Sequence, residues 1–132
     1  MKIGFTGTRD GMTPMQAAQL RTLLASYRGS ELHHGDCVGA DIEAEAIALE
    51  CGLTVVVHPP TDRRFRANSK QPAYEPKDYM ARNRNIVLAC EMLIACPKED
   101  KEMQRGGTWS TWRLAQRLKK PTKLLCPKGS AQ

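Results

Sequence analysis

Short apolar runs alternate with amphipathic segments along the chain. The apolar runs predict strands at residues 2–5, 31–34, 53–58, 91–96 and 122–126. Between them, apolar residues recur at helical spacing and predict helices that follow Thr13, Gly39, residue 76 and Gly106. This alternation is typical of an α/β protein, a three-layer sandwich with a mostly parallel five-stranded sheet.

The first helix and the third strand carry additional local signals. Thr13, Pro14 and Gln16 form a capping-box pattern with proline in the first turn. The run 53–58 is too apolar for a one-sided sheet, so we expect a central strand buried on both faces. Residues 59–76 then form a long polar segment without a clear period, which favours a mobile loop able to close on an anion through cations such as Arg66.

Length and composition fit one globular domain. The 132 residues, 41% hydrophobic and 26% charged, predict a domain at 1–127 with a polar tail at 128–132. The apolar runs are shorter than the roughly 20 residues that cross a bilayer. The N-terminus also has no apolar signal segment. We therefore expect a cytoplasmic protein with no membrane partner.

Cysteine and histidine patterns give no metal signal. The five cysteines form no CxxC pair, and we expect them to be reduced, small buried side chains. His33 and His34 fall on opposite faces of a strand, so they do not jointly ligate a metal. We expect neither a metal site nor a resident cofactor.

The charge is positive and unevenly distributed. A formal net charge of +6 favours an anionic partner. Acidic residues gather between positions 31 and 50, whereas the stretch 113–128 carries basic residues and no acid. A uniform surface for a polyanion is therefore not expected.

The loop after the first strand has the composition of a phosphate cradle. Parallel sheets hold ligands at the carboxyl ends of their strands. There, Gly7, Thr8 and Arg9 offer open backbone, a hydroxyl and a guanidinium. The segment has neither the GxGxxG pattern nor the GK[ST] of a P-loop, so a dinucleotide dehydrogenase or Walker ATPase is poorly supported. In the alternative interpretation, Gly7 only forms a turn and Arg9 is solvated.

The second loop combines glycines and acids at a strand-to-helix junction. Its candidate ligand-binding residues are Gly35, Asp36, Gly39 and Asp41. Either carboxylate suits a hydrogen bond from ribose hydroxyls, a helix cap or a catalytic base, so Asp36 and Asp41 are the catalytic candidates. For Asp41, helix capping is the simplest role.

The third helix and the fourth loop complete the candidate site. Asn83 falls on the expected buried stripe and needs a polar partner. Either Asn83 and Arg82 contact an anionic ligand, or Asn83 only packs between helices while the arginine side chain is solvated. The fourth loop is the most phosphate-like, with glycines and hydroxyls at a helix N-terminus: Gly106, Gly107, Thr108, Ser110 and Thr111. Trp109 and Trp112 add aromatic surface able to stack on a base, although the spacing of Trp112 also suits the core.

Together, segments 4–9, 35–41, 82–84 and 106–111 resemble the SLOG superfamily of Rossmann-like nucleotide-binding proteins, and within it the small single-domain YspA/YpsA-related type. The resemblance implies a Rossmann-like fold that binds a nucleotide or nucleotide-derived small molecule in a crevice at the carboxyl edge of the sheet, in a sensor or sequestering role. It also implies that Arg82 and Asn83 reach into this crevice. Superfamily relatives often associate, which allows a homodimer or higher oligomer.

Two alternatives follow from the same resemblance. LOG phosphoribohydrolases, which are distantly similar, cut the N-glycosidic bond of nucleoside monophosphates with a glutamate shortly after PGGxGT. Here residues 111–114 read TWRL and Arg105 replaces the proline, so Asp36 or Asp41 would have to act instead. Single-stranded DNA binding occurs in the related DNA-processing protein A family, but the acidic stretch 36–50 would repel a phosphate backbone, and nucleic acid is the least favoured partner.

Overall fold

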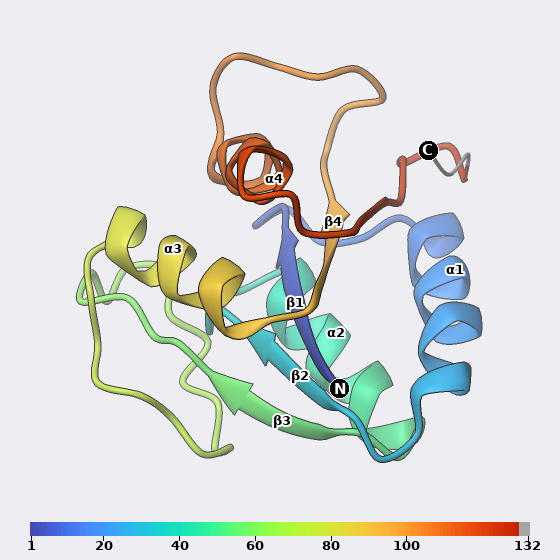
Figure 1. Ribbon diagram of the computed structural model, residues 1–132, viewed down its shortest axis with the longest axis horizontal. Coiled ribbons are helices and arrows are strands. Elements are labelled where there is room, and N and C mark those ends of the chain that lie inside the picture. Colours follow the sequence, from blue (N-terminus) through green and yellow to red (C-terminus); the bar gives the residue numbers. More distant parts are fainter. Residues whose placement is uncertain (130–132) are drawn as a thin grey trace.

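A five-stranded sheet, parallel throughout, forms the centre of the computed structural model (Figure 1). The structure describes residues 1–129, so the last three residues of the predicted tail 128–132 lie outside it. In the order of the sheet, the strands are β3 (Thr54–Val57), β2 (Glu31–His34), β1 (Lys2–Gly7), β4 (Met92–Cys96) and β5 (Thr122–Leu124). The predicted α/β fold is confirmed.

Helices cover both faces of the sheet. They are α1 (Pro14–Leu24), α2 (Ala40–Glu50), α3 (Tyr79–Ala89) and α4 (Gly107–Arg117), with a short 3-10 helix, η1 (Ala25–Tyr27), after α1. The pair α1 and α2 packs on one face and the pair α3 and α4 on the other, which gives the three predicted layers (Figure 1). Within residues 1–129, none of the helices has the length and apolarity to cross a membrane.

Side-chain caps fix where α1 and α3 begin. The Thr13 hydroxyl accepts from the Gln16 backbone N–H at 3.1 Å, and the Gln16 side chain accepts from the Thr13 N–H at 3.0 Å, as the capping-box pattern predicts. Asp78 caps α3 by accepting from the Ala81 N–H at 2.8 Å. These bonds satisfy donors that the first helical turn leaves without a partner.

The central strand β1 separates two buried clusters. Ile3 and Phe5 pack in the cluster under α1 and α2. On the opposite face, a Cβ at Gly4 would lie 2.9 Å from the Cys90 Sγ and 3.1 Å from Ile86. Glycine at this position therefore lets α3 approach the sheet closely, which brings the first turn of α3 toward the ends of β1 and β2.

The expectation that residues 53–58 form a central strand is wrong, because β3 is at the edge of the sheet. Its outer side is covered by residues 59–76, which we call the edge segment. The Val57 N–H donates to the Pro72 carbonyl at 2.9 Å, and the Tyr74 N–H donates to the Val57 carbonyl at 3.0 Å. Val55 and Val57 are buried in the cluster under α1 and α2, which explains the apolar sequence, and the edge segment supplies the backbone partners that a second neighbouring strand would supply.

Candidate ligand-binding site

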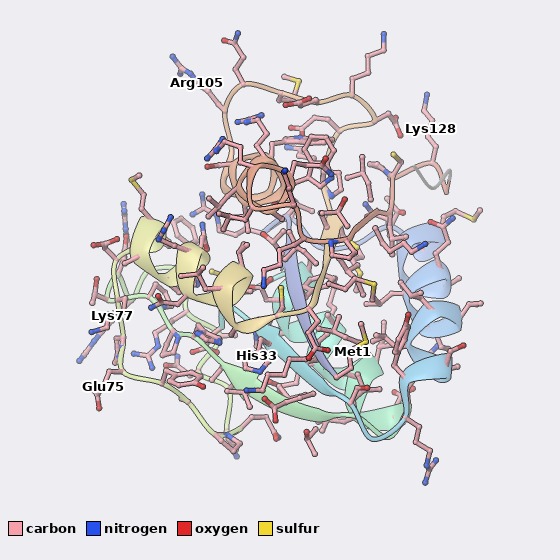
Figure 2. All side chains as sticks on the ribbon, viewed as in Figure 1. Met1, His33, Glu75, Lys77, Arg105 and Lys128 are labelled. Carbon is pink, nitrogen blue, oxygen red and sulfur yellow. The ribbon has the colours of Figure 1, made fainter. Side chains whose placement is uncertain are left out.

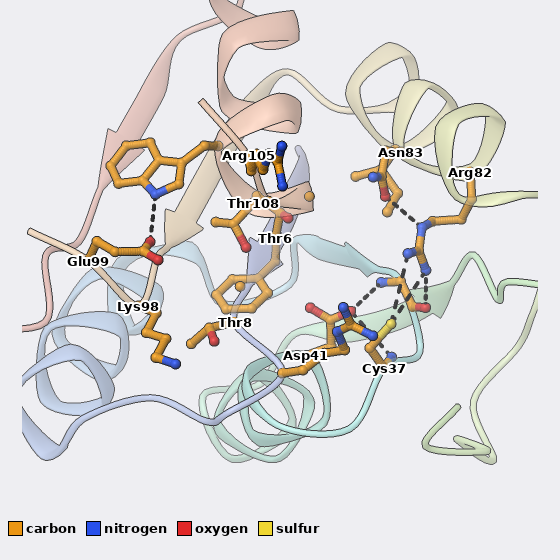
Figure 3. Close-up of a pocket in the computed structure, with 18 residues that line it drawn as sticks. Thr6, Thr8, Cys37, Asp41, Arg82, Asn83, Lys98, Glu99, Arg105 and Thr108 are labelled. Carbon is orange, nitrogen blue, oxygen red and sulfur yellow. Dashed lines mark hydrogen bonds between the residues drawn. The ribbon is translucent and has the colours of Figure 1, made fainter. Parts of the chain in front are cut away.

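A cavity of about 180 Å³ lies at the carboxyl ends of the central strands, where all the predicted loops meet (Figure 3). Most of the predicted site residues line it: Gly7, Thr8, Arg9, Gly35, Asp41, Arg82, Asn83, Gly106, Gly107 and Thr108. Strand β1 continues through Gly7, two residues beyond its predicted end, so Thr6 also reaches the cavity. Segments distant in the sequence thus share one concave surface.

Asp36 is not among the cavity-lining residues, contrary to expectation. It adopts a left-handed backbone conformation, with φ of 56°, and its side chain is buried against the edge segment. Its carboxylate accepts from the Ser69 N–H at 2.8 Å and pairs with the Arg66 Nε at 3.3 Å. Asp36 therefore holds the edge segment in place, and Arg66 is engaged there as its partner.

Gly39, Ser110 and Thr111 also lie outside the cavity lining. A Cβ at Gly39 would lie 2.3 Å from the Arg9 carbonyl oxygen, so glycine there lets the first and second loops pack together. The Thr111 hydroxyl is buried and donates back to the Gly107 carbonyl at 2.7 Å. Ser110 is exposed and lines a neighbouring groove between α3 and α4.

Arg82, rather than Asn83, occupies the buried position on α3. Its side chain is only 6% exposed. The guanidinium donates to the Gly35 carbonyl, to the His58 carbonyl at 3.3 Å and to the Asn83 Oδ1 at 2.6 Å. Asn83 thus finds its polar partner in Arg82. These bonds hold a positive charge and an amide beside the cavity (Figure 3).

Asp41 lies in the first turn of α2 and is 6% exposed. Its Oδ2 accepts from the backbone N–H of Gly35 at 3.1 Å and of Cys37 at 3.3 Å. Its Oδ1 is buried without a hydrogen-bond partner among the described residues. Burial raises the pKa of Asp41, against the lowering influence of the nearby His34 and Arg82.

Further cations surround the cavity. The Arg9 guanidinium stacks on the Phe65 ring of the edge segment, 4.1 Å from its centroid. Lys98 pairs with Asp10 at 2.8 Å. Arg105 extends from the loop before α4 and is exposed (Figure 2). Lys98 was not among the predicted residues, although its place directly after β4, beyond Pro97, was a usable signal.

The tryptophans are arranged differently from the expectation. Trp109 is the core residue, 2% exposed, and its Nε1–H donates to the Glu99 carboxylate at 2.8 Å. Trp112 is half-buried and packs edge-on against it, with ring centroids 5.7 Å apart. The face of Trp109 is therefore not free to stack on a base. Glu99 is another cavity residue that the sequence interpretation missed.

The chain is similar to known proteins in structure and, more weakly, in sequence. No family model matches the chain, and no curated protein matches it. Solved structures do. The molybdenum cofactor binding protein from Rippkaea orientalis is 27% identical with a TM-score of 0.73, over 95% of this chain and 76% of its own. The Moco carrier protein from Chlamydomonas reinhardtii is 25% identical with a TM-score of 0.63, over 97% and 78%.

The chain is also similar to the DNA processing protein A from Helicobacter pylori, a protein described as binding single-stranded DNA. It is 25% identical with a TM-score of 0.68, over 94% of this chain, which spans 64% of that protein. These neighbours are SLOG-type Rossmann-like proteins. The resemblance inferred from the loop motifs is thus confirmed.

Proposed function

We propose that this SLOG-type protein binds a nucleotide or a nucleotide-derived small molecule, with a phosphate group held in the cavity. The observation that carries the proposal is convergence: residues 6–9, Gly35, Arg82 and the start of α4 line one cavity. The N-cap residue of α4 is Gly106, which has no side chain to accept from the first-turn N–H groups. Such donors at a helix N-terminus bind phosphate oxygens.

The charge of the lining supports an anionic ligand. Four cations line the cavity, namely Arg9, Arg82, Lys98 and Arg105, against the acids Asp41 and Glu99. Lys98 is paired with Asp10, but Arg82 donates to carbonyl and amide oxygens. Arg82 thus forms no direct ion pair with any of residues 1–129, and its charge, which the nearby Asp41 offsets in part, adds to the attraction for an anion in the cavity.

The relatives support a ligand-binding role in general terms. Two of them are described as binding or carrying the molybdenum cofactor, and one as binding single-stranded DNA. The cofactor and the DNA are ligands of those proteins, and an oligonucleotide is the comparison ligand in the salt series described below. The cavity of about 180 Å³ suits part of a mononucleotide rather than a long strand.

Isothermal titration calorimetry against mononucleotides, ADP-ribose and NAD tests the proposal. We expect at least one of them to bind with micromolar to millimolar affinity, and Arg9→Ala to weaken that binding about tenfold through loss of a guanidinium–phosphate contact. The matched control is Arg28→Ala, which removes the same charge from the exposed turn at the opposite edge of the sheet. Absence of binding at millimolar concentration would overturn the proposal.

A salt series separates this function from DNA binding. A polythymidine oligonucleotide that binds more tightly than any mononucleotide, and weakens steeply between 50 and 200 mM salt, would replace the small-molecule proposal. We expect the oligonucleotide to bind no more tightly than a mononucleotide.

We propose binding rather than N-glycosidic hydrolysis. The stretch 111–114, which reads TWRL, stands where LOG-type proteins carry their glutamate, and none of its residues lines the cavity. The Arg113 guanidinium is held by the Glu102 carboxylate at 2.9 Å and by the Met103 carbonyl at 2.8 Å. Chromatography after incubation with each nucleotide should show intact substrate, and release of free base would refute this choice.

A further inference from the structure

The buried carboxylate of Asp41 has one satisfied and one unsatisfied oxygen. The N–H groups of Gly35 and Cys37 both donate to Oδ2, at 3.1 and 3.3 Å. Oδ1 has no partner within the described part of the chain, although the side chain is 94% buried and lines the cavity (Figure 3). A buried carboxylate oxygen left without a donor is costly, and a bound ligand is one source of the missing donor.

The surroundings of Asp41 restrict that donor to an uncharged group. Arg82 is buried in the same wall, and a Cβ at Gly35 would lie 2.3 Å from its Nη1 and 3.0 Å from the Asp41 Oδ2. Glycine at this position therefore leaves room for the carboxylate and the guanidinium, which both lie close to the same backbone segment. With Arg9 and Arg105 on the same cavity, an ammonium group would meet several positive charges. A hydroxyl donor meets no such repulsion.

The size of the cavity places the hydroxyl on the sugar. A volume of about 180 Å³ is below the roughly 300 Å³ at which pockets begin to enclose a whole small-molecule ligand. It accommodates a phosphate and the adjoining sugar and leaves a base outside. Asp41 lines this space, together with Thr8 and Thr108.

We infer that Asp41 accepts a hydrogen bond from a ribose hydroxyl through Oδ1, so that the site selects ribonucleotide-type ligands over their deoxyribose counterparts. This inference rests on the proposed function and names the part of the ligand that decides its specificity. A hydroxyl bound to a buried carboxylate discriminates strongly against an analogue that lacks the hydroxyl, because the carboxylate oxygen is then left unpaired again.

The test measures the affinities of matched ribose, 2′-deoxyribose and 3′-deoxyribose mononucleotides by calorimetry. The wild-type protein should prefer the ribose form about 10- to 100-fold over at least one deoxy form. In Asp41→Asn, the amide oxygen keeps accepting from Gly35 and Cys37 while the NH₂ group replaces Oδ1, a donor in place of an acceptor. The ribose preference should fall markedly, because a neutral amide forms a weaker hydrogen bond to the hydroxyl than a carboxylate does. The affinity for the deoxy form should stay the same or rise, because a negative charge leaves the cavity.

Glu50→Gln is the matched control, because it removes the same charge from the far, exposed end of α2 and should keep the full preference. Equal wild-type affinity for ribose and both deoxy ligands would overturn the inference while leaving the proposed function standing. If no mononucleotide binds, the proposed function itself fails. The wild-type comparison needs no variant, so it decides the matter even where Asp41→Asn folds poorly.

Discussion

Replacing Arg82 by alanine should destabilise the protein strongly, because this guanidinium connects α3 to the ends of β2 and β3. It donates to the carbonyls of Gly35 and His58, the latter at 3.3 Å, and its side chain is 6% exposed. Truncation leaves these two carbonyls without this donor, at about 1 kcal/mol or more each. It also removes the donor to the Asn83 Oδ1 and the packing of the aliphatic stem. Relief of the buried charge offsets part of this cost. We expect a net loss of about 3 kcal/mol.

The loss is measurable by thermal unfolding followed by circular dichroism. For a chain of 132 residues, about 3 kcal/mol corresponds to a fall in Tm of roughly 10 °C. Arg84→Ala is the matched control, since Arg84 lies two residues further along the same helix and is exposed; its effect should stay within about 0.5 kcal/mol. If the two variants melt within a few degrees of each other, the buried guanidinium does not hold the loops together.

Further predictions concern pH, glycine and the capping box. Burial, with the charges of His33 and Arg82 adding to it, lowers the pKa of His58 to about 4, so protonation between pH 6.5 and 4 favours the unfolded chain. The urea midpoint should fall over that window, and less so in His58→Gln. Gly39→Ala should destabilise the protein by at least about 2 kcal/mol, more than Gly106→Ala. Both glycines have positive φ, but only at Gly39 would the added Cβ also clash with a carbonyl oxygen, that of Arg9. Equal losses of stability in urea titration would contradict this clash. Thr13→Ala should cost about 1 kcal/mol in the same assay, and an unchanged midpoint would contradict the cap.

The loops of the site could be predicted because the carboxyl ends of parallel strands all lie at one edge of the sheet, whatever the order of the strands. Once the chain was assigned alternating strands and helices, the segments after β1, β2 and β4 had to share an edge of the sheet. That rule placed Gly7, Gly35 and Gly107 on one cavity without any knowledge of side-chain packing. It applied equally to Lys98 and Glu99, which the polarity of their loop concealed.

Side-chain direction was harder to predict, because one residue decides it. Neighbouring side chains on α3 point about 100° apart, so an error of one position in locating the buried stripe exchanges Asn83 for Arg82. In the structure, Arg82 is the buried residue. In the second loop, Asp36 has a left-handed backbone conformation that its sequence position did not indicate, and its carboxylate binds the edge segment rather than lining the cavity. The edge position of β3 was concealed too, since Pro72 and Tyr74 cover it as a neighbouring strand would.

The most direct measurement is an NMR titration of the ¹⁵N-labelled protein with a ribonucleotide that binds in calorimetry. The largest shifts should fall on the backbone amides of Thr8, Gly35, Gly107 and Thr108, with the amide of Thr54 at the start of β3 unmoved. A bound phosphate at the carboxyl edge requires all of the first group to respond together. Shifts confined to another surface, or spread evenly over the chain, would contradict a single phosphate-binding cavity.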